Sequence, residues 1–256
     1  MDSQEVIDLE EIVKDRAWNF YKRIRKFWQP KHLDDVNIIF DWSGVSFVPD
    51  ETKFDEKEIG PELKPEQHVT IFKSVFENKS EREQMHSLKA ERQTVAICKS
   101  SLTKGFTKGR NVGLTLQAPQ NIITASVGYS KGFTVTSVEE STDQKTLTWT
   151  IEGSLTVAPN SELTAEVHIK EKRCKYDFTT RVAIRGKVVA KIYDLQNKLL
   201  IAYTGDMNTI LAKLSDKLQH MNLKIDGETV FLDIAGQSKF NFGTQQETII
   251  SECGKK

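Results

Sequence analysis

A long uncharged segment, GRNVGLTLQAPQNIITASVGYSKG from Gly109 to Gly132, constrains this chain more than any other part of its sequence. Its residues alternate between apolar and small polar side chains, break at Pro119, and alternate again. That pattern predicts two antiparallel strands joined by a turn. No charged residue stands between Arg110 and Lys131. Soluble hairpins ordinarily place charges on their solvent face, so the pattern raises the question of what this hairpin contacts.

The two arms of the hairpin, Gly109–Gln117 and Ile122–Ser130, separate into two faces when Thr115 is placed opposite Thr124, with Ile122 beside the turn as the exception. The apolar, predicted membrane-facing side carries Val112, Leu114, Leu116, Ile123, Ala125, Val127 and Tyr129. The polar, predicted lumen-facing side carries Asn111, Gly113, Thr115, Thr124, Ser126 and Gly128. Each arm is about as long as a tilted membrane-spanning strand. Tyr129 with the cations Arg110 and Lys131 at the open end is typical of a headgroup interface.

Two interpretations of the hairpin stay open at this point. An alternating hairpin is ordinarily a half-buried part of a soluble sheet. Charge at mid-depth in a bilayer costs roughly 2–4 kcal/mol per residue, so its absence suits a segment that passes through lipid. One hairpin cannot span a bilayer alone, because the N–H and C=O groups of its edges would lack partners. The membrane interpretation therefore predicts a homo-oligomer whose hairpins close into a barrel.

The composition excludes several other classes of function. Lys and Arg together number 36 and so do Asp and Glu, which argues against nucleic acid as a partner. From Gln93 to Val138 there is no acidic residue, so the hairpin region is compositionally distinct. No apolar run is long enough for a transmembrane helix. The first residues, MDSQEVIDLEEIV, lack the apolar core of a signal peptide, so both secretion and storage in the cytoplasm before release are kept as alternatives.

The chain offers no catalytic or metal-binding pattern. Its histidines are dispersed without metal-ligand spacing: His32, His68, His86, His168 and His220. Neither a G-x-S-x-G motif nor a phosphate-binding loop occurs. The three cysteines, Cys98, Cys174 and Cys253, are too few and too scattered for a disulfide framework, although one bridge stays open. We therefore expect no enzyme, no cofactor and no metal.

The rest of the chain predicts a mainly β protein of long, twisted antiparallel strands with an N-terminal helical and aromatic cap. Apolar residues at helical spacing run from Val6 to Phe27, and Pro30 ends the pattern. Asp50–Gln67 is charged and interpreted as a connection, and 207–221 is predicted to be one amphipathic helix. Thr-, Val- and Ile-rich segments predict strands elsewhere. We expect three regions: 1–65 with the N-terminal helix, joined by parts of the central chain; 66–190 as the central elongated β region with the hairpin at 104–136; and 191–256 with one amphipathic helix and the closing strands.

Aromatic residues are concentrated in the first 54 positions. Phe20, Ile24 and Phe27 are predicted to pack inward. Trp18, Tyr21 and Trp28 fall on a neighbouring helical face and are candidates for contact with a sugar or a lipid headgroup. Ordinary core packing is the alternative for each of them.

At this point the chain resembles the aerolysin-like β-pore-forming proteins, most of all their epsilon-toxin and mosquitocidal-toxin branch. Four stretches carry the resemblance: NFYKRIRKFWQP, the uncharged hairpin with its Ser/Thr-rich flanks, LTVAPNSELTAEVHIKEKRCKYDFTTRVAIRG, and FLDIAGQSKFNFGTQQETII. Together they span nearly the whole chain, and their order and spacing are more specific than any one of them.

The resemblance implies an elongated antiparallel β protein that binds a cell surface, oligomerises and inserts a transmembrane β-barrel. It implies a receptor site at Trp18, Tyr21, Phe27 and Trp28, the last two corresponding to the aromatic pair before the family's first turn. The partners would be a target-cell membrane and a glycan, lipid or protein receptor. We expect a pore-forming toxin or defence protein. The alternatives are a non-lytic lectin or carrier and an intracellular membrane-remodelling protein. Without a signal peptide or an activation peptide, release and activation stay open.

Overall fold

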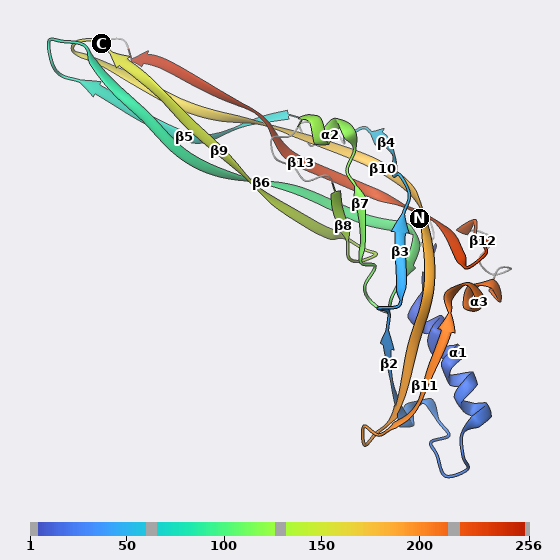
Figure 1. Ribbon diagram of the computed structural model, residues 1–256. Coiled ribbons are helices and arrows are strands. Elements are labelled where there is room, and N and C mark those ends of the chain that lie inside the picture. The colour runs from blue at the N-terminus through green and yellow to red at the C-terminus, as the bar shows by residue number, and fades with distance from the viewer. Residues whose placement is uncertain (1–4, 60–65, 126–131, 215–220, 254–256) are drawn as a thin grey trace.

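A computed structural model describes residues 5–59, 66–125, 132–214 and 221–253 of the chain. It is an elongated molecule whose strands run along most of its length, with one long helix beside the end drawn at the bottom of Figure 1. The helices are α1 (Leu9–Ile24), α2 (Gln120–Ala125) and α3 (Met207–Ala212), with a 3₁₀ turn at Leu33–Asp35.

The strands are far longer than those of an ordinary sandwich, as the Ser/Thr-rich pattern predicts. The four longest are β6 (Gln84–Thr107), β9 (Ser141–Val157), β10 (Ser161–Asp194) and β13 (Thr229–Cys253). The others are β1 (Glu5–Asp8), β2 (Val36–Asp41), β3 (Val45–Pro49), β4 (Lys53–Lys57), β5 (Glu66–Asn78), β7 (Leu114–Gln117), β8 (Gly132–Val135), β11 (Leu199–Asp206) and β12 (Lys224–Asp226).

Strand β10, 34 residues long, is the spine of the sheet. Along one edge it pairs in turn with β5, β4, β3 and β2, all antiparallel. Along the other edge it pairs with β13 and then with β11. Strand β13 pairs with β6, and β6 pairs with β9 and β1. Because β10 is continuous past position 190, the expected division at that position falls inside a strand, and the three-region division stays a prediction.

Two segments differ from their local sequence preference. Residues 77–93 have helical propensity, yet they form the β5–β6 turn and the start of β6, where Gln84 pairs with Val157. The side-chain amide of Asn78 fixes this turn by donating to the carbonyl oxygens of Arg82, Val157 and Ala158. The expected connection 50–67 contains β4, because Phe54 pairs with Phe178 of the spine and packs on its ring. Pairing to a long neighbour therefore overrides propensity at both places.

Helix α1 begins at Leu9 and ends at Ile24, so it is shorter than its apolar pattern at both ends. Its buried stripe is Leu9, Val13, Ala17 and Tyr21, a strict four-residue spacing. The prediction that Phe20, Ile24 and Phe27 pack inward is wrong, since they are 40%, 50% and 81% exposed. The predicted place of Tyr21 on the exposed face is also wrong, since it is 1% exposed. A strict four-residue spacing advances about 40° around the helix at each step, whereas a mixed three- and four-residue spacing stays close to one line along it.

The buried core is uneven along the molecule. A large cluster joins α1, α3 and the central strands, whereas the distal arm of β5, β6, β9, β10 and β13 holds only small clusters, such as Leu155, Val157, Leu163 and Ala165. Cys98 and Cys174 are buried free thiols. Near the C-terminus the predicted amphipathic helix begins at Met207 as expected, with α3 ending at Ala212 and Leu214 packing on the core; residues 215–220 lie outside the described part.

Candidate membrane-inserting segment and aromatic tip

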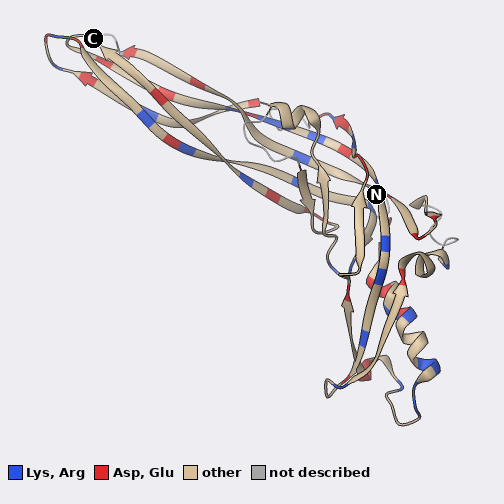
Figure 2. Ribbon diagram, viewed as in Figure 1, with Lys and Arg blue, Asp and Glu red and all other residues tan. Residues whose placement is uncertain are grey.

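The uncharged segment connects β6 to β9, and we call residues 108–136 the tongue; its residues 126–131 lie outside the described part. The tongue lies folded along the body. Its strands β7 and β8 form a two-stranded sheet, and α2 lies beyond the end of β7 (Figure 1). In Figure 2 the ribbons of β7, α2 and β8 carry neither blue nor red. Between Arg110 and Lys131 the tongue is therefore an uncharged layer on a body that is charged elsewhere.

The first arm of the tongue has the two faces that the sequence predicts. Val112, Leu114 and Leu116 are at most 2% exposed, whereas the alternate residues Asn111, Gly113 and Thr115 are exposed. The hydroxyl oxygens of Thr115 and Thr134 lie 3.2 Å apart on the outer face. The face predicted to meet lipid is thus hidden against the protein in this conformation, and the polar face meets water.

An aromatic cluster on the sheet receives the apolar face of the tongue. Phe133 of β8 is 1% exposed, with its ring centroid 5.6 Å from that of Phe240 and 6.1 Å from that of Phe178. Asn121 of α2 donates from its amide to the hydroxyl of Tyr176, at 2.8 Å. Burial raises the pKa of Tyr176 to about 12, although the hydrogen bond from Asn121 opposes that rise. At this cluster the tongue is held by aromatic packing and by one part-buried hydrogen bond.

The second arm differs from the predicted strand. Ile122–Ala125 belong to α2, with Ile122 buried, Ile123 half-buried, and Thr124 and Ala125 exposed. The predicted pairing of Thr115 with Thr124 is therefore wrong for this conformation, in which Thr115 pairs with Thr134. The carbonyl of Pro119 accepts from the amides of Ile122 and Ile123 and starts the helix, which buries Ile122. Ser126, Val127, Gly128, Tyr129 and Lys131 lie outside the described residues, and Arg110 is exposed.

The strands on either side of the tongue already form a long hairpin. β6 and β9 pair from Gln84–Val157 to Ser100–Ser141 without a register shift. Inside the tongue the register is different, because Leu114 pairs with Val135. The numbers of paired residues add to 241 in the first ladder and to 249 in the second. The tongue is therefore not a continuation of the ladder that leads into it. The predicted barrel pairing, with Thr115 opposite Thr124, lies much closer to the β6–β9 register.

The second feature is an exposed aromatic tip, made by the loop after α1 and the turn between β10 and β11. Phe27 is 81% exposed, Trp28 66% and Leu195 65%. The side chain of Gln29 accepts from the amide of Lys26 at 2.7 Å and closes the loop, so that Phe27 and Trp28 point outward. A cavity of about 510 Å³ lies between loop and turn, lined by Phe27, Trp28, Gln29, Pro30, Lys31, His32, Asp35, Asp194, Leu195 and Gln196.

The structure separates the four predicted receptor residues. Phe27 and Trp28 lie together, with ring centroids 4.8 Å apart, and the Lys26 ammonium lies 5.1 Å from the Trp28 ring. Trp18 is half-buried and stacks on the buried Tyr21 at 5.2 Å. Sequence reasoning missed Leu195, because the β10–β11 turn is far away in the chain. The turn itself can be predicted, because aspartate side chains often accept from backbone amides in turns. Here Asp194 accepts from the amides of Gln196 and Lys198.

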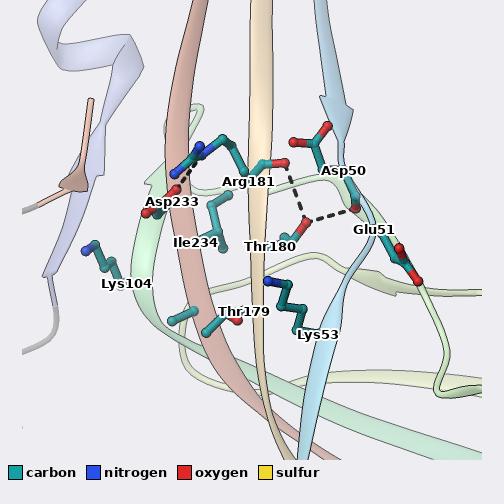
Figure 3. A pocket seen from close by; sticks show the side chains of 10 residues that line it. Asp50, Glu51, Lys53, Lys104, Thr179, Thr180, Arg181, Asp233 and Ile234 are labelled. Carbon is teal, nitrogen blue, oxygen red and sulfur yellow. Dashed lines mark hydrogen bonds and ion pairs between the residues drawn. The ribbon is translucent and has the colours of Figure 1, made fainter. Parts of the chain in front are cut away.

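A polar hollow on the outer face of the sheet is the third feature (Figure 3). Its volume is about 500 Å³, and its charged lining residues are Asp50, Glu51, Lys53, Lys104, Arg181 and Asp233. Arg181 binds Asp233 at 2.8 Å, and Asn222 donates to the same carboxylate at 2.7 Å. Burial alone would raise the pKa of Asp233, but these two hydrogen bonds outweigh it and hold the pKa below its ordinary value. Three acids and three bases leave the hollow without net charge.

None of the helices in the described part of the chain has the length and hydropathy of a membrane span. Likewise, the described residues bring no three His, Cys, Asp or Glu side chains together in a group that could hold a metal ion.

Comparison with known proteins gives similarity in structure but not in sequence. No family model matches the chain, and no curated protein matches it. A crystal structure of a non-toxic crystal protein from Bacillus thuringiensis matches with a TM-score of 0.56 at 12% identity, over 96% of this chain and 97% of the other.

Two further structures match at lower TM-scores. A β-pore-forming protein from Brevibacillus laterosporus gives 0.45 at 13% identity, over 97% of this chain and 90% of the other. The parasporin-2 toxin of Bacillus thuringiensis, which recognises cancer cells, gives 0.41 at 14% identity, over 84% and 75%. With its long antiparallel strands and its single spine strand, the chain has an elongated aerolysin-like fold.

Proposed function

We propose that this protein is a pore-forming toxin or defence protein whose tongue leaves the sheet and becomes the wall of an oligomeric β-barrel. One observation carries the proposal. Between Arg110 and Lys131 the tongue carries no charge, the apolar face of its first arm is buried against the body, and the tongue lies at the end of the long β6–β9 hairpin. When the tongue leaves the body, its apolar face loses contact with the protein and would be exposed to water. Lipid can cover that face instead. In a ring of copies, the backbone N–H and C=O groups at the edge of each hairpin bond to those of the neighbouring hairpin.

The proposed events begin at the aromatic tip. Phe27, Trp28 and Leu195 form an exposed apolar group, which is unusual on a soluble surface unless it binds something. They bind a receptor or headgroup on the target cell, copies gather there, and the tongues insert together. Region 1–65 supplies the tip with the β10–β11 turn, region 66–190 supplies the tongue, and region 191–256 closes the sheet. The protein acts at a target-cell membrane after release, without catalysis and without a cofactor.

A non-lytic binding protein is the second candidate. One of the similar structures is described as that of a non-toxic protein, and the apolar residues of the first arm of the tongue are buried as in a resting sheet. In that case the tip would bind and the tongue would never leave.

The deciding experiment is dye release from target cells and from liposomes, run beside detection of detergent-resistant oligomers. The pore proposal expects leakage and oligomers together. Tip-dependent binding without either, before and after mild proteolysis, would favour the non-lytic candidate and contradict the pore.

Replacement of Trp28 by alanine tests the tip. We expect cell binding to fall about tenfold or more, as for an exposed aromatic anchor. The melting temperature should change little, because the side chain is 66% exposed. Leakage of receptor-free liposomes at high dose should stay near wild type. Lys22→Ala, at an exposed position of α1 outside the lining of the tip cavity, is the control. A large drop in melting temperature, or unchanged cell binding, would contradict the assignment.

A further inference from the structure

The base of the tongue is tied to the N-terminal segment by one carboxylate. Asp8 ends β1 and caps α1, since its Oδ1 accepts from the amide of Glu10 at 2.9 Å. The same oxygen accepts from the amide of Gly109, the first residue after the β6 bend, also at 2.9 Å. The start of the helix and the start of the tongue therefore share one acceptor, and that acceptor carries a charge when ionised, which strengthens both bonds.

Gly109 is also held by its shape. Its φ is +67°, a left-handed conformation that favours glycine, and a Cβ there would lie 2.9 Å from Oε2 of Glu10. Burial raises the pKa of Glu10, helped by the charge of Asp8 and opposed by Lys14. Beside it, the ammonium of Lys108 lies 4.6 Å from the ring centroid of Phe47. The chain thus makes a sharp bend beneath the first turn of α1 rather than continuing straight from β6.

Strand β1 occupies the edge of β6 along which the β6–β9 ladder would grow. Each strand has two edges, and at Lys104 one edge is paired with Ala235 of β13 while the other is paired with Glu5 of β1. The β6–β9 ladder uses that second edge up to Ser100, and Leu102 still donates to the carbonyl of Val138 at 2.9 Å. Beyond it, β1 covers β6 from Lys104 to Thr107.

Growth of the ladder therefore requires β1 to leave. Extending the pairing of Ser100 with Ser141 in the same register would place Ser137 opposite Lys104 and Thr134 opposite Thr107. Those positions on β6 are taken by Glu5 and Asp8. Thr134 itself is paired with Thr115 inside the folded tongue. The same movement that frees the β6 edge also breaks the bond from Gly109 to Asp8, so the two contacts act as one unit.

We propose that β1 and the Asp8 carboxylate form an autoinhibitory latch, in which the N-terminal strand blocks the edge of β6 and pins the base of the tongue until Glu5–Asp8 detaches. The proposal rests on the pore function proposed above and names how it is restrained. Helix α1 connects the latch directly to the loop that carries Phe27 and Trp28 (Figure 1). A ligand that pulls on the tip therefore acts on the latch through one rigid element.

Hydrogen exchange in solution tests the latch without any membrane. In Asp8→Ala we expect the amide of Val112, which donates to the carbonyl of Thr136, to exchange about tenfold faster or more, as for loss of a bond to a charged acceptor. Asp8→Asn keeps an oxygen acceptor at the same place and should recover most of the protection.

The control variant separates the latch from helix stability. Asn19→Gly weakens α1 at an exposed position, because glycine has a lower helix propensity than asparagine, yet it touches no part of the tongue. It should leave the exchange of Val112 unchanged. Equal protection in Asp8→Ala and wild type, or equal loss in Asn19→Gly and Asp8→Ala, would overturn the latch whether or not the protein makes pores.

A disulfide that holds β1 in place is the second test. Glu5 and Lys104 are directly paired on neighbouring strands, so Glu5→Cys with Lys104→Cys should crosslink under mild oxidation. We expect oxidised protein to bind cells but to release no dye, and reduction to restore release; each single variant, oxidised alone, should remain active. Full release by the crosslinked protein overturns the latch. Absence of release by wild type contradicts the pore instead, and the exchange experiment then still decides the latch.

Discussion

Arginine at position 125 should abolish conductance, whereas arginine at position 124 should leave a conducting pore with changed ion selectivity. The two residues are neighbours on α2, and both are exposed in the resting protein, so either substitution is compatible with the soluble fold. In the predicted barrel they separate, with Ala125 facing lipid and Thr124 facing the lumen. One pair of variants therefore distinguishes the two faces without disturbing the starting structure.

The expected difference follows from the cost of charge in lipid. Arginine at the bilayer midplane costs about 2–4 kcal/mol, and this cost is repeated in every subunit of the ring. Ala125→Arg should therefore bind cells and assemble but not insert. Thr124→Arg places a ring of cations in the channel, which should shift the current towards anions. The variant Leu114→Asp, which also addresses the lipid face, is less informative, because Leu114 is 2% exposed and its replacement would damage the soluble protein as well.

The measurements are single-channel conductance and reversal potential in planar bilayers under a salt gradient, with melting temperatures as the control on folding. Equal loss of conductance in both variants would mean that the alternation does not describe the two faces of a barrel wall. Normal conductance with Ala125→Arg would mean that the residues of α2 do not form part of the pore wall.

Sequence reasoning recovers the faces of the tongue but not its resting partners. The alternation of Val112, Leu114 and Leu116 with polar residues predicts that one side of this arm is buried, and these three residues are buried in the resting protein. The same pattern cannot tell whether protein or lipid covers that side. The helix at Ile122–Ala125 was missed because its stability comes from burying Ile122 against the body and from Asn121 bonding Tyr176, both distant in sequence.

The same limit applies to the tip and to the latch. Phe27 and Trp28 could be found because they stand just before Pro30, where the helical sequence pattern stops, whereas Leu195 joins them only through the β10–β11 hairpin. Asp8 is a readable helix cap, since an acidic residue precedes an apolar periodic run. Its second bond, to Gly109, depends on the parallel pairing of β1 with β6, which no local pattern encodes.

A disulfide between positions 115 and 134 should trap the protein before insertion. Thr115 and Thr134 are directly paired on the outer face of the tongue, with hydroxyl oxygens 3.2 Å apart. Cysteines at both positions should therefore crosslink in the soluble protein under mild oxidation. The crosslink lies away from the buried face, so the resting fold and cell binding should be unaffected.

The trapped register is incompatible with the predicted barrel. In the inserted hairpin Thr115 lies opposite Thr124, and a crosslink to position 134 forbids that pairing as well as the extended β6–β9 register. Because side chains alternate with a period of two, both of those registers keep the same residues facing lipid, so only the partner of β7 has to change. We expect dye release to fall by at least about tenfold on oxidation, since one covalent bond blocks every route to the new pairing, and to return on reduction.

The complementary pair makes the test symmetric. Thr115→Cys with Thr124→Cys should not crosslink in solution, where Thr124 lies on α2, but should crosslink in assembled pores without stopping conductance. Each single cysteine variant, treated with the same oxidant, controls for the native thiols at 98, 174 and 253. Undiminished leakage by the oxidised 115–134 pair would mean that β7 and β8 insert with the pairing they already have. The barrel would then be built from the resting tongue as it stands, and no exchange of partners would be needed.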